Sequence, residues 1–458
     1  MNRETDFTRG PIAGPLLRFC LPILLALFLQ ALYGAVDLII VGKYAAAADV
    51  SGVAVGSQLM MTITGLVSSF SMGTTILLGQ KLGEGDRDAL GRIVGTSILL
   101  FLGAGVLLTI LVPLLSGRLA HLMNAPAEAF DQTRRYLAIC GAGYVMIVAY
   151  NVLGSVMRGM GDSKTPLVTV AVASVCNIVG DLILVKGFQM GAAGAALATV
   201  LSQTISVAFS LLLLQRGGLP FFFGRQDIRL HMPVLRRIAI YGAPIALQDL
   251  LVGLSFLIIL SIVNRLGLIA SAGVGVAEKV CAFIMLLPLA FMQAMSAYVA
   301  QNHGAGKDER AVRGLKIAIG LSMAFGAAMF YLAYFHGDLL AGFFSNDAAV
   351  VAAGFDYLRA YAIDCLFTCF LFCFIGFFNG LGHTGFVMVQ GILAAFFVRV
   401  PVAWYMARTT GQLFHIGLSV PCSTVAEIAA CFLFYVYIQR KQRMKTGSLP
   451  TVDGDRTV

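Results

Sequence analysis

Long apolar runs, separated by short polar stretches, dominate the chain. About twelve of these runs have roughly 20 residues, the length that an α-helix needs to cross a bilayer. They lie near 16–41, 50–78, 92–115, 136–157, 166–186, 191–214, 238–263, 272–300, 313–335, 357–379, 385–406 and 414–438. A transmembrane barrel would instead show short segments of alternating polarity. The pattern therefore predicts an all-α polytopic membrane protein with twelve transmembrane helices.

Composition supports this class. Of the 458 residues, 59% are hydrophobic and only 12% are charged, and the mean hydropathy is +0.86. A soluble protein of this length needs far more charge to cover its surface. The first apolar run is too long for the core of a signal peptide, so we interpret it as a retained first span.

The placement of Lys and Arg predicts the orientation. With a cytoplasmic N-terminus, 22 of the 32 basic residues fall on the cytoplasmic side. The opposite side receives eight: Lys43, Arg118, Arg134, Arg135, Lys186, Arg265, Arg359 and Arg408. This bias predicts a multi-pass plasma-membrane protein with both termini cytoplasmic. It also explains the net charge of +9 by topology and by attraction to the anionic lipid bilayer, without nucleic acid.

The second half of the chain repeats the first at a constant offset. "GQKLGEGDRDALGR" (79–92) aligns with "AQNHGAGKDERAVR" (300–313), and "RGMGDSKT" (158–165) aligns with "NGLGHTGF" (379–386). Because the repeated unit holds six helices, an even number, both copies keep the same orientation in the membrane. The sequence thus predicts two parallel six-helix repeats, a frequent architecture of secondary transporters.

The repeat also predicts domain boundaries. We expect an N-lobe over 1–215 with helices 1–6 and a C-lobe over 238–440 with helices 7–12. Residues 216–237, rich in Arg and Gly, would form a cytoplasmic linker between them, and 441–458 a cytoplasmic tail.

Polar residues inside three spans of the first repeat fall at a similar depth. Asp37 lies in the outer third of span 1, Asn177 and Asp181 in span 5, and Thr199 and Gln203 in the outer half of span 6. An ionisable group in a span costs roughly 2.5–3.5 kcal/mol on insertion scales, which makes each a functional candidate. The alternative is two structural acids satisfied by Ser, Thr or backbone groups.

These side chains offer hard oxygen ligands. Two acids that share a desolvated site favour uptake of a proton, and the same oxygens suit a small cation. If the cation is Na⁺, Asp37, Asn177 and Asp181 are the expected metal ligands. The sequence does not distinguish H⁺ from Na⁺.

The second repeat carries a different set of buried charges. Asp249, Arg399 and Glu427 all lie well inside their spans. An Arg with two acids favours a mutually neutralising structural network over a second ion site, although both readings stay open. Glu278 and Lys279 are adjacent near the outer edge of span 8, and we expect them to be interfacial.

The cysteines do not predict chemistry. Cys365, Cys369 and Cys373 repeat every four residues and form one stripe on a helix. A metal or redox site is one interpretation, but no histidine lies nearby in the run, and packing of small residues is favoured.

Several motifs resemble those of the multidrug and toxic compound extrusion transporters. They are "LYGAVDLIIVGKY" in span 1, "MRGMGDSKTP" (157–166), its echo "FNGLGHTG" (378–385) and "FFVRVP" in span 11. The resemblance covers essentially the whole chain. It implies two six-helix bundles in a V shape that export drugs, usually organic cations, in exchange for protons or sodium.

The resemblance also implies roles for individual residues. In the branch with an N-lobe acid site, the positions that match Asp37, Asn177, Asp181 and Thr199 bind the coupling cation. A first-span proline that lets the helix bend matches Pro22, and proline interrupts the helical hydrogen-bond ladder on its own terms.

The chain departs from the branch with a C-lobe ion site. The acids expected in spans 7 and 10 would fall at Val252 and Thr368, whereas Asp249 and Asp364 are displaced by about a turn. We therefore expect the coupling site in the N-lobe.

The predicted function is antiport of small-molecule drugs or toxic metabolites by a monomer, with no cofactor beyond the coupling ion. Tyr33, one turn before Asp37, and Gln203 are the expected substrate contacts. An ATP-driven pump would carry GxxxxGK[ST], and a membrane enzyme HExxH or an activated nucleophile; the sequence contains neither. The alternative function is a flippase for a lipid-linked saccharide or related anionic lipid, whose cleft should be rich in Arg and Lys.

Overall fold

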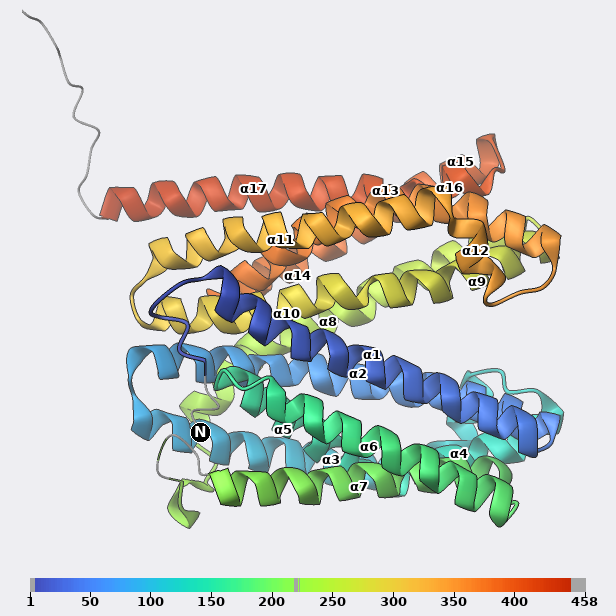
Figure 1. The fold of residues 1–458 in the computed structure, drawn as a ribbon, viewed down its shortest axis with the longest axis horizontal. Coiled ribbons are helices and arrows are strands. Elements are labelled where there is room, and N and C mark those ends of the chain that lie inside the picture. The colour runs from blue at the N-terminus through green and yellow to red at the C-terminus, as the bar shows by residue number, and fades with distance from the viewer. Residues whose placement is uncertain (1–4, 218–220, 222, 446–458) are drawn as a thin grey trace, which may run out of the picture.

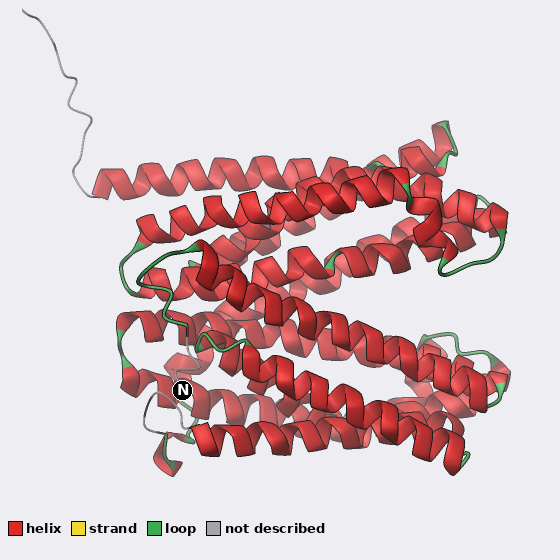
Figure 2. Cartoon of the chain, in the orientation of Figure 1, coloured by secondary structure: helices red, strands yellow, loops and turns green. Residues whose placement is uncertain are grey.

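The structure is a computed structural model that describes residues 5–217, 221 and 223–445. Every regular element in these residues is a helix, and mostly short loops connect the helices (Figure 2). Arg3, positions 218–220 and 222 of the expected linker, and positions 446–458 of the expected tail lie outside the described residues.

Among the described residues, eleven helices are long and apolar enough to cross a membrane, and a bent helix pair supplies a twelfth span. The helices of the first half are α1 (Ala13–Tyr44), α2 (Ala47–Glu84), α3 (Arg87–Leu122), η1 (Ala127–Ala129), α4 (Phe130–Ala142), α5 (Tyr144–Gly159), α6 (Lys164–Asp181), η2 (Leu182–Gly187) and α7 (Gly191–Gly217). The short η3 (Arg225–Asp227) follows, and the second half has α8 (Met232–Asn264), α9 (Leu268–Ile284), α10 (Leu286–Gly304), α11 (Asp308–Phe335), α12 (Gly337–Gly342), α13 (Ala348–Gly380), α14 (Thr384–Ala394), η4 (Ala395–Arg399), α15 (Val400–Thr409), α16 (Leu413–Gly417) and α17 (Ser419–Lys445). The predicted all-α polytopic class is confirmed.

The fourth span is broken rather than continuous. Helices α4 and α5 meet at an angle of 57° around Gly143. A Cβ at Gly143 would lie 2.2 Å from Cγ1 of Val200, so only glycine allows α7 to approach this closely. The apolar run at 136–157 gave no signal of this break.

The helices form two bundles that diverge from one end of the molecule in a V shape (Figure 1). We call α1–α7 the N-lobe and α8–α17 the C-lobe. The lobes contact each other chiefly where α2 packs against α8 and α10, and where α1 packs against α10. The end that carries the loops at 84–87, 159–164, 304–308 and 380–384 is called the closed end, and the other the open end. Both described chain ends lie at the closed end (Figure 1).

Two glycines bring the lobes together at the closed end. A Cβ at Gly83 would lie 2.0 Å from the carbonyl oxygen of Gln301, and one at Gly304 would lie 1.9 Å from that of Gln80. The sequence repeat aligns Gly83 with Gly304 and Gln80 with Gln301, so α2 and α10 contact each other through equivalent surfaces. Gln80 Nε2 also donates to the carbonyl oxygen of Gly380 at 3.0 Å.

The repeat is visible in the backbone as well. Gly85 and Gly306, which the repeat aligns, both adopt left-handed conformations, with φ of 77° and 69°. Gly161 and Gly382, a second aligned pair, have φ of 82° and 83°. Residues other than glycine rarely adopt such backbone angles. The two predicted repeats are therefore confirmed at the turns that reverse the chain.

The segment that precedes α1 joins the two lobes at the closed end. Phe7 is buried, with its ring 5.1 Å from that of Phe19 and 5.5 Å from that of Tyr298. Arg310 Nε donates to the Phe7 carbonyl at 2.8 Å, while the Thr5 amide donates to a carbonyl of the N-lobe loop after α5 at 3.2 Å. The segment therefore contacts both lobes.

Candidate functional site: a polar cluster between α1, α6 and α7

The candidate site lies inside the N-lobe, where α1, α6 and α7 pack against one another. Asp37 is buried, whereas Ile39, two positions further on, is two-thirds exposed. The helical period places these two side chains on different faces of α1. Asp37 thus points into the bundle rather than toward lipid, and α6 contributes the buried Asn177 and Asp181.

The two acids lie together. The carboxyl groups of Asp37 and Asp181 are within interaction range, and Asp181 is the last residue of α6 before the π-helical turn η2. Such turns frequently mark functional sites. Asn177, one turn earlier on α6, donates from Nδ2 to Thr199 Oγ1 at 3.5 Å, and Thr199 in turn donates to the Ala195 carbonyl at 3.0 Å. The structure thus brings the four expected coupling residues into one region.

The polar cluster between α1, α6 and α7 contains several buried oxygen atoms that accept no hydrogen bond from a described residue. Among the residues that the structure describes, five buried oxygen atoms find no hydrogen-bond partner: Oδ1 of Asp37, Oδ1 of Asn177, both carboxylate oxygens of Asp181 and Oε1 of Gln203. A buried polar group without a partner costs about 1–3 kcal/mol, and more when it is charged. A proton or a cation would satisfy these oxygen atoms, and that is the chemistry expected of a coupling site.

The expected substrate contacts lie beside this cluster. Tyr33 is within hydrogen-bonding reach of Gln203 and within electrostatic range of Asp37. Sequence reasoning missed Tyr136 of α4, which is buried next to Tyr33 and Asp37. The signal was present, because the repeat aligns Tyr136 with Tyr357, but Tyr136 sits in an apolar stretch that suggests packing.

Pro22 lies inside α1, which is a single uninterrupted helix from Ala13 to Tyr44. The proline is buried toward the closed end, several turns before Asp37 along the helix. The hinge expected there stays a prediction.

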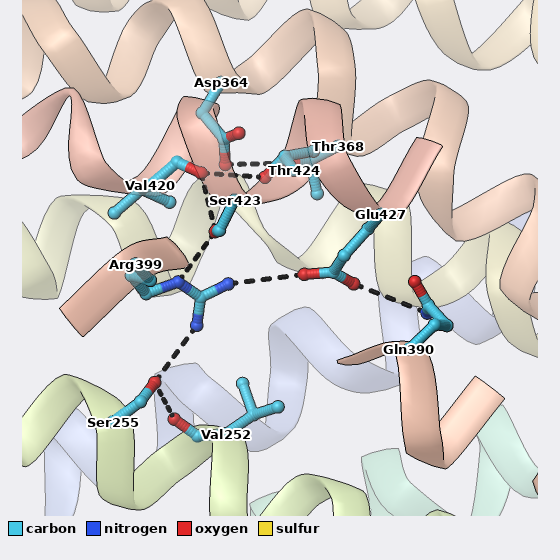
Figure 3. A network of polar contacts seen from close by, with 10 residues as sticks. All are labelled: Val252, Ser255, Asp364, Thr368, Gln390, Arg399, Val420, Ser423, Thr424 and Glu427. Atoms are coloured by element: carbon cyan, nitrogen blue, oxygen red, sulfur yellow. Dashed lines mark hydrogen bonds and ion pairs between the residues drawn. The ribbon is translucent and has the colours of Figure 1, made fainter. Parts of the chain in front are cut away.

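The C-lobe polar residues form a different arrangement (Figure 3). Arg399, at the end of the π-helical turn η4, pairs with Glu427 at 3.6 Å, and both are nearly inaccessible. Arg399 also donates from Nε to Ser423 at 2.9 Å and from Nη1 to Ser255 at 3.2 Å. Gln390 Nε2 donates to the second oxygen of Glu427 at 3.5 Å. Arg399 and Glu427 therefore neutralise each other, as the sequence suggested.

Asp249 does not join this network, which corrects the expectation for it. Its carboxylate accepts a hydrogen bond from Ser69 of α2, across the boundary between the lobes. The depth expected for Asp249 in span 7 was compatible with contact to Ser69 or to the Arg399–Glu427 network. The sequence does not show which face of α8 packs against which helix. Asp364 lies with the network instead and accepts from Thr368 at 2.7 Å (Figure 3).

The cysteine stripe contributes to packing. Cys365, Cys369 and Cys373 are buried on α13 without disulfides, and a Cβ at Gly326 would lie 2.8 Å from the Cys369 sulfur. Within the described residues, no group of three or more His, Cys, Asp or Glu side chains could hold a metal ion. The N-lobe cluster, with two acids, depends on amide and hydroxyl oxygens to complete any cation shell.

Two known proteins resemble this chain in sequence over almost its whole length. The probable multidrug resistance protein YpnP of Bacillus subtilis is 27% identical over 433 residues, covering 94% of this chain and 96% of that protein. The multidrug export protein MepA of Staphylococcus saprophyticus is 23% identical, covering 95% of this chain and 96% of that protein.

Solved structures show the same fold. The outward-facing conformation of a multidrug resistance MATE family transporter of the MOP superfamily superposes with a TM-score of 0.89 at 21% identity, covering 96% of this chain and 99% of the other. The MatE family model matches residues 22–183 and 244–405, once in each repeat. The chain therefore belongs to the MatE family, the multidrug and toxic compound extrusion transporters.

Proposed function

We propose that this protein is a secondary antiporter that exports organic cations or amphipathic drugs in exchange for H⁺ or Na⁺. The names of its full-length relatives, multidrug resistance and multidrug export proteins, support the export of drugs. The coupling ion and the residues that bind it are proposed from the geometry of the N-lobe cluster.

The set of unpartnered acceptors around Asp37 and Asp181 is the observation that carries the proposal. When both acids are ionised, their charges repel each other and attract a cation. One proton or one Na⁺ removes the repulsion and occupies acceptors that the protein leaves open. A drug cation and a coupling cation thus compete for the same negative charge, which is the basis of exchange.

A bend of α1 near Pro22 would link this event to release of the drug. The part of α1 after Pro22 contains both Tyr33 and Asp37. A change in the direction of this part of the helix would therefore move an expected substrate contact and a proposed coupling acid together. The lobes, expected at 1–215 and 238–440, would then rock about the glycine contacts at the closed end.

The orientation follows from charge. The closed end carries basic residues in or next to the loops after α2, α5 and α10, among them Lys81, Arg87, Lys164 and Lys307. Under the positive-inside rule, the closed end faces the cytoplasm. The described structure is then open to the outside, with both termini cytoplasmic and the monomer embedded in the plasma membrane.

The flippase alternative is less well supported by the structure. An anionic lipid needs free basic groups in the cleft, but the guanidinium of Arg399 is committed to Glu427, Ser423 and Ser255. The N-lobe cluster offers acids instead.

Purified protein in liposomes would test the proposal. A pH gradient and a Na⁺ gradient are imposed separately, and efflux of ethidium, a fluorescent organic cation, is followed. We expect one gradient to accelerate efflux and Asp37→Asn to eliminate that acceleration. Equal ethidium efflux with and without either gradient would contradict antiport, and gradient-driven efflux that persists in Asp37→Asn would contradict the assignment of the site.

A further inference from the structure

The segment at residues 5–9, which we call the N-terminal arm, is attached to the C-lobe by one basic side chain in particular. Arg310 of α11 donates from Nε to the Phe7 carbonyl at 2.8 Å and from Nη2 to the Arg9 carbonyl at 2.9 Å. Hydrogen bonds from charged donors are stronger than those between neutral groups. Arg310 therefore fixes two backbone groups of the arm at once.

Other side chains of the C-lobe complete this attachment. Lys307 Nζ donates to the Thr8 carbonyl at 2.9 Å. The Phe7 amide donates to Gln301 Oε1 at 3.3 Å, and Asn302 Nδ2 donates to the Phe7 carbonyl at 3.3 Å. The backbone groups of the arm are thus paired by α10, by α11 and by the loop between them.

The start of α1 also packs in the C-lobe. Leu16 and Phe19 are buried in a hydrophobic cluster with residues of α10, α11 and α13. Near the other end of the helix, Ile40 and Val41 are buried among N-lobe residues. Helix α1 therefore passes from one lobe to the other along its length, and the arm lies at the end that the C-lobe holds.

The contact of the arm with the N-lobe is weaker. The Thr5 amide donates to the carbonyl of Gly161, in the loop after α5, at 3.2 Å. A Cβ at Gly161 would lie 2.8 Å from the Thr5 carbonyl oxygen and 3.1 Å from Gln301 Nε2. The arm, the N-lobe loop and α10 therefore meet at this glycine. Because the Thr5 contact has no charged donor, we expect it to break first when the lobes separate at the closed end.

The second repeat has a comparable segment, which lies before α8 and contacts the N-lobe. Thr96 Oγ1 of α3 donates to the Arg229 carbonyl at 3.2 Å. A Cβ at Gly95 would lie 1.9 Å from the Asp227 carbonyl oxygen, so the backbones are in close contact here. The repeat aligns α1 with α8 and α3 with α11. In each repeat, the segment before the first helix thus contacts the lobe formed by the other repeat.

The two segments differ in how they are held. The offset of 221 residues places Ala89 of α3 at the position of Arg310, and an alanine side chain cannot donate a hydrogen bond. Arg310 also lies in the first turn of α11, which begins at Asp308. A cation is unfavourable there because the helix dipole is positive at that end. The arm that Arg310 holds accounts for a cation that its own helix disfavours.

We propose that the N-terminal arm is a latch that keeps the closed end shut, and that Arg310 is the positioning residue that holds it in place. While the arm lies on Arg310, its Thr5 amide stays against the N-lobe loop and links the two lobes. The closed end opens when this link breaks, and the arm then remains on the C-lobe. The inference goes beyond the proposed function, because it concerns the opening of the closed end whatever ion or drug the protein carries.

The distance between the lobes at the closed end tests the latch. In the full-length protein, p-acetylphenylalanine replaces Asp88 and Glu309, which are exposed and occupy equivalent positions in the two repeats. Ketone-reactive spin labels at these positions leave the native cysteines unlabelled. Double electron–electron resonance then gives the ratio of open to shut molecules. A second labelled pair, at Glu309 and Lys441, measures a distance within the C-lobe.

Arg310→Gln removes the charged donor, so the ratio of open to shut molecules should rise about tenfold or more. Arg313→Gln is the matched control, because Arg313 lies one turn further along α11 and its ion pair is with Glu309 rather than with the arm. We expect this variant to keep the ratio of the unchanged protein. Arg310→Lys keeps the charge and should restore part of the shut population.

Thr5→Pro tests the other side of the latch without changing Arg310. Proline has no backbone N–H, so the variant loses the donor to the Gly161 carbonyl and keeps the side chains that hold the arm on the C-lobe. The ratio of open to shut molecules should rise about threefold or more. Melting temperatures of all variants report whether each still folds.

The outcomes separate a latch from a structural role. A shift of the inter-lobe distance in Arg310→Gln and Thr5→Pro, with an unchanged distance between positions 309 and 441, supports the latch. If the distance within the C-lobe changes as well, Arg310 maintains the fold of that lobe and the inference is overturned. If Arg310→Gln has the same ratio as Arg313→Gln, the arm is not a latch, and the proposed antiport is then judged by the Asp37→Asn efflux alone.

Discussion

The two lobes place polar side chains on equivalent spans but satisfy them differently. In the N-lobe, Asp37 and Asp181 lie within interaction range of each other, and several acceptors in this cluster have no donor among the described residues. In the C-lobe, Arg399 and Glu427 pair and make further hydrogen bonds with Ser and Gln side chains (Figure 3). A π-helical turn adjoins both clusters, at η2 and η4.

The difference teaches that the repeated fold does not decide what a polar cluster does. A buried pair whose charges cancel, such as Arg399 and Glu427, has no need of a ligand, and loss of either member leaves an uncompensated charge that destabilises the fold. In the proposed antiport, the acids of the N-lobe cluster take up their partner as an ion that binds and is then released. Removing one member of the C-lobe pair should destabilise the protein, whereas removing an acid of the N-lobe cluster should stop coupling and leave the fold intact.

The largest expected effect is on coupling, from Asp181→Asn. The amide has almost the same shape but cannot carry the charge that a proton or Na⁺ neutralises. Gradient-driven ethidium efflux should fall to the level of liposomes without protein, while the melting temperature stays the same or rises. Efflux at the unchanged rate would show that the two acids are structural, like their C-lobe counterparts.

The next effect is on stability, from Arg399→Met. This variant leaves Glu427 buried without its partner, and loss of one member of a buried pair costs about 3–5 kcal/mol. The double variant with Glu427→Leu removes the stranded charge, so its melting temperature in detergent should recover much of the loss. A single variant as stable as the unchanged protein would mean that the pair is not the structural counterpart of the N-lobe acids.

A smaller effect is expected where the lobes meet, from Gly83→Ala. The new methyl group would lie 2.0 Å from a backbone oxygen of α10, which cannot move cheaply, and overpacking of this kind costs about 1–3 kcal/mol. Thermal unfolding and chemical cross-linking between the lobes would both report it. Gly65→Ala in the same helix meets open space and should be neutral or stabilise by up to about 1 kcal/mol. Equal behaviour of the two variants would argue against a tight contact at the closed end.

The smallest effect is expected from Ser69→Ala, which removes the donor to Asp249. The Asp249 side chain is exposed, so other donors replace the lost hydrogen bond and the change should stay below about 1 kcal/mol. Ser57→Ala, elsewhere on α2, is the control. A loss of ethidium efflux specific to Ser69→Ala would give this inter-lobe contact a role beyond stability.

The fold could be predicted from the sequence in large part. Apolar runs of span length, the bias of Lys and Arg and the constant offset between the two halves are local or additive signals, and the structure confirms the helical class and the repeats. The break at Gly143 was not predictable from the apolar run at 136–157, and the need for glycine there comes from Val200, which belongs to a different span and is distant in the sequence.

For the candidate site, the sequence could predict the depth of the polar residues along their spans but not their contacts. Asp37, Asn177, Asp181 and Thr199 could be placed at one level because helical rise converts sequence position into depth in the membrane. The partners of Asp249 and Asp364 depend on the rotation of each helix about its axis, and rotation is set by packing between spans.

The sequence by itself determined that this chain crosses the membrane about twelve times in two related halves, with acids buried in its spans. This holds because hydrocarbon excludes polar groups wherever they occur, whatever surrounds them. Only the tertiary structure decided which buried charges cancel and which remain open to a ligand. That outcome depends on distances of a few ångströms between residues of different helices, such as Arg399 and Glu427, and the order of residues along the chain does not contain those distances.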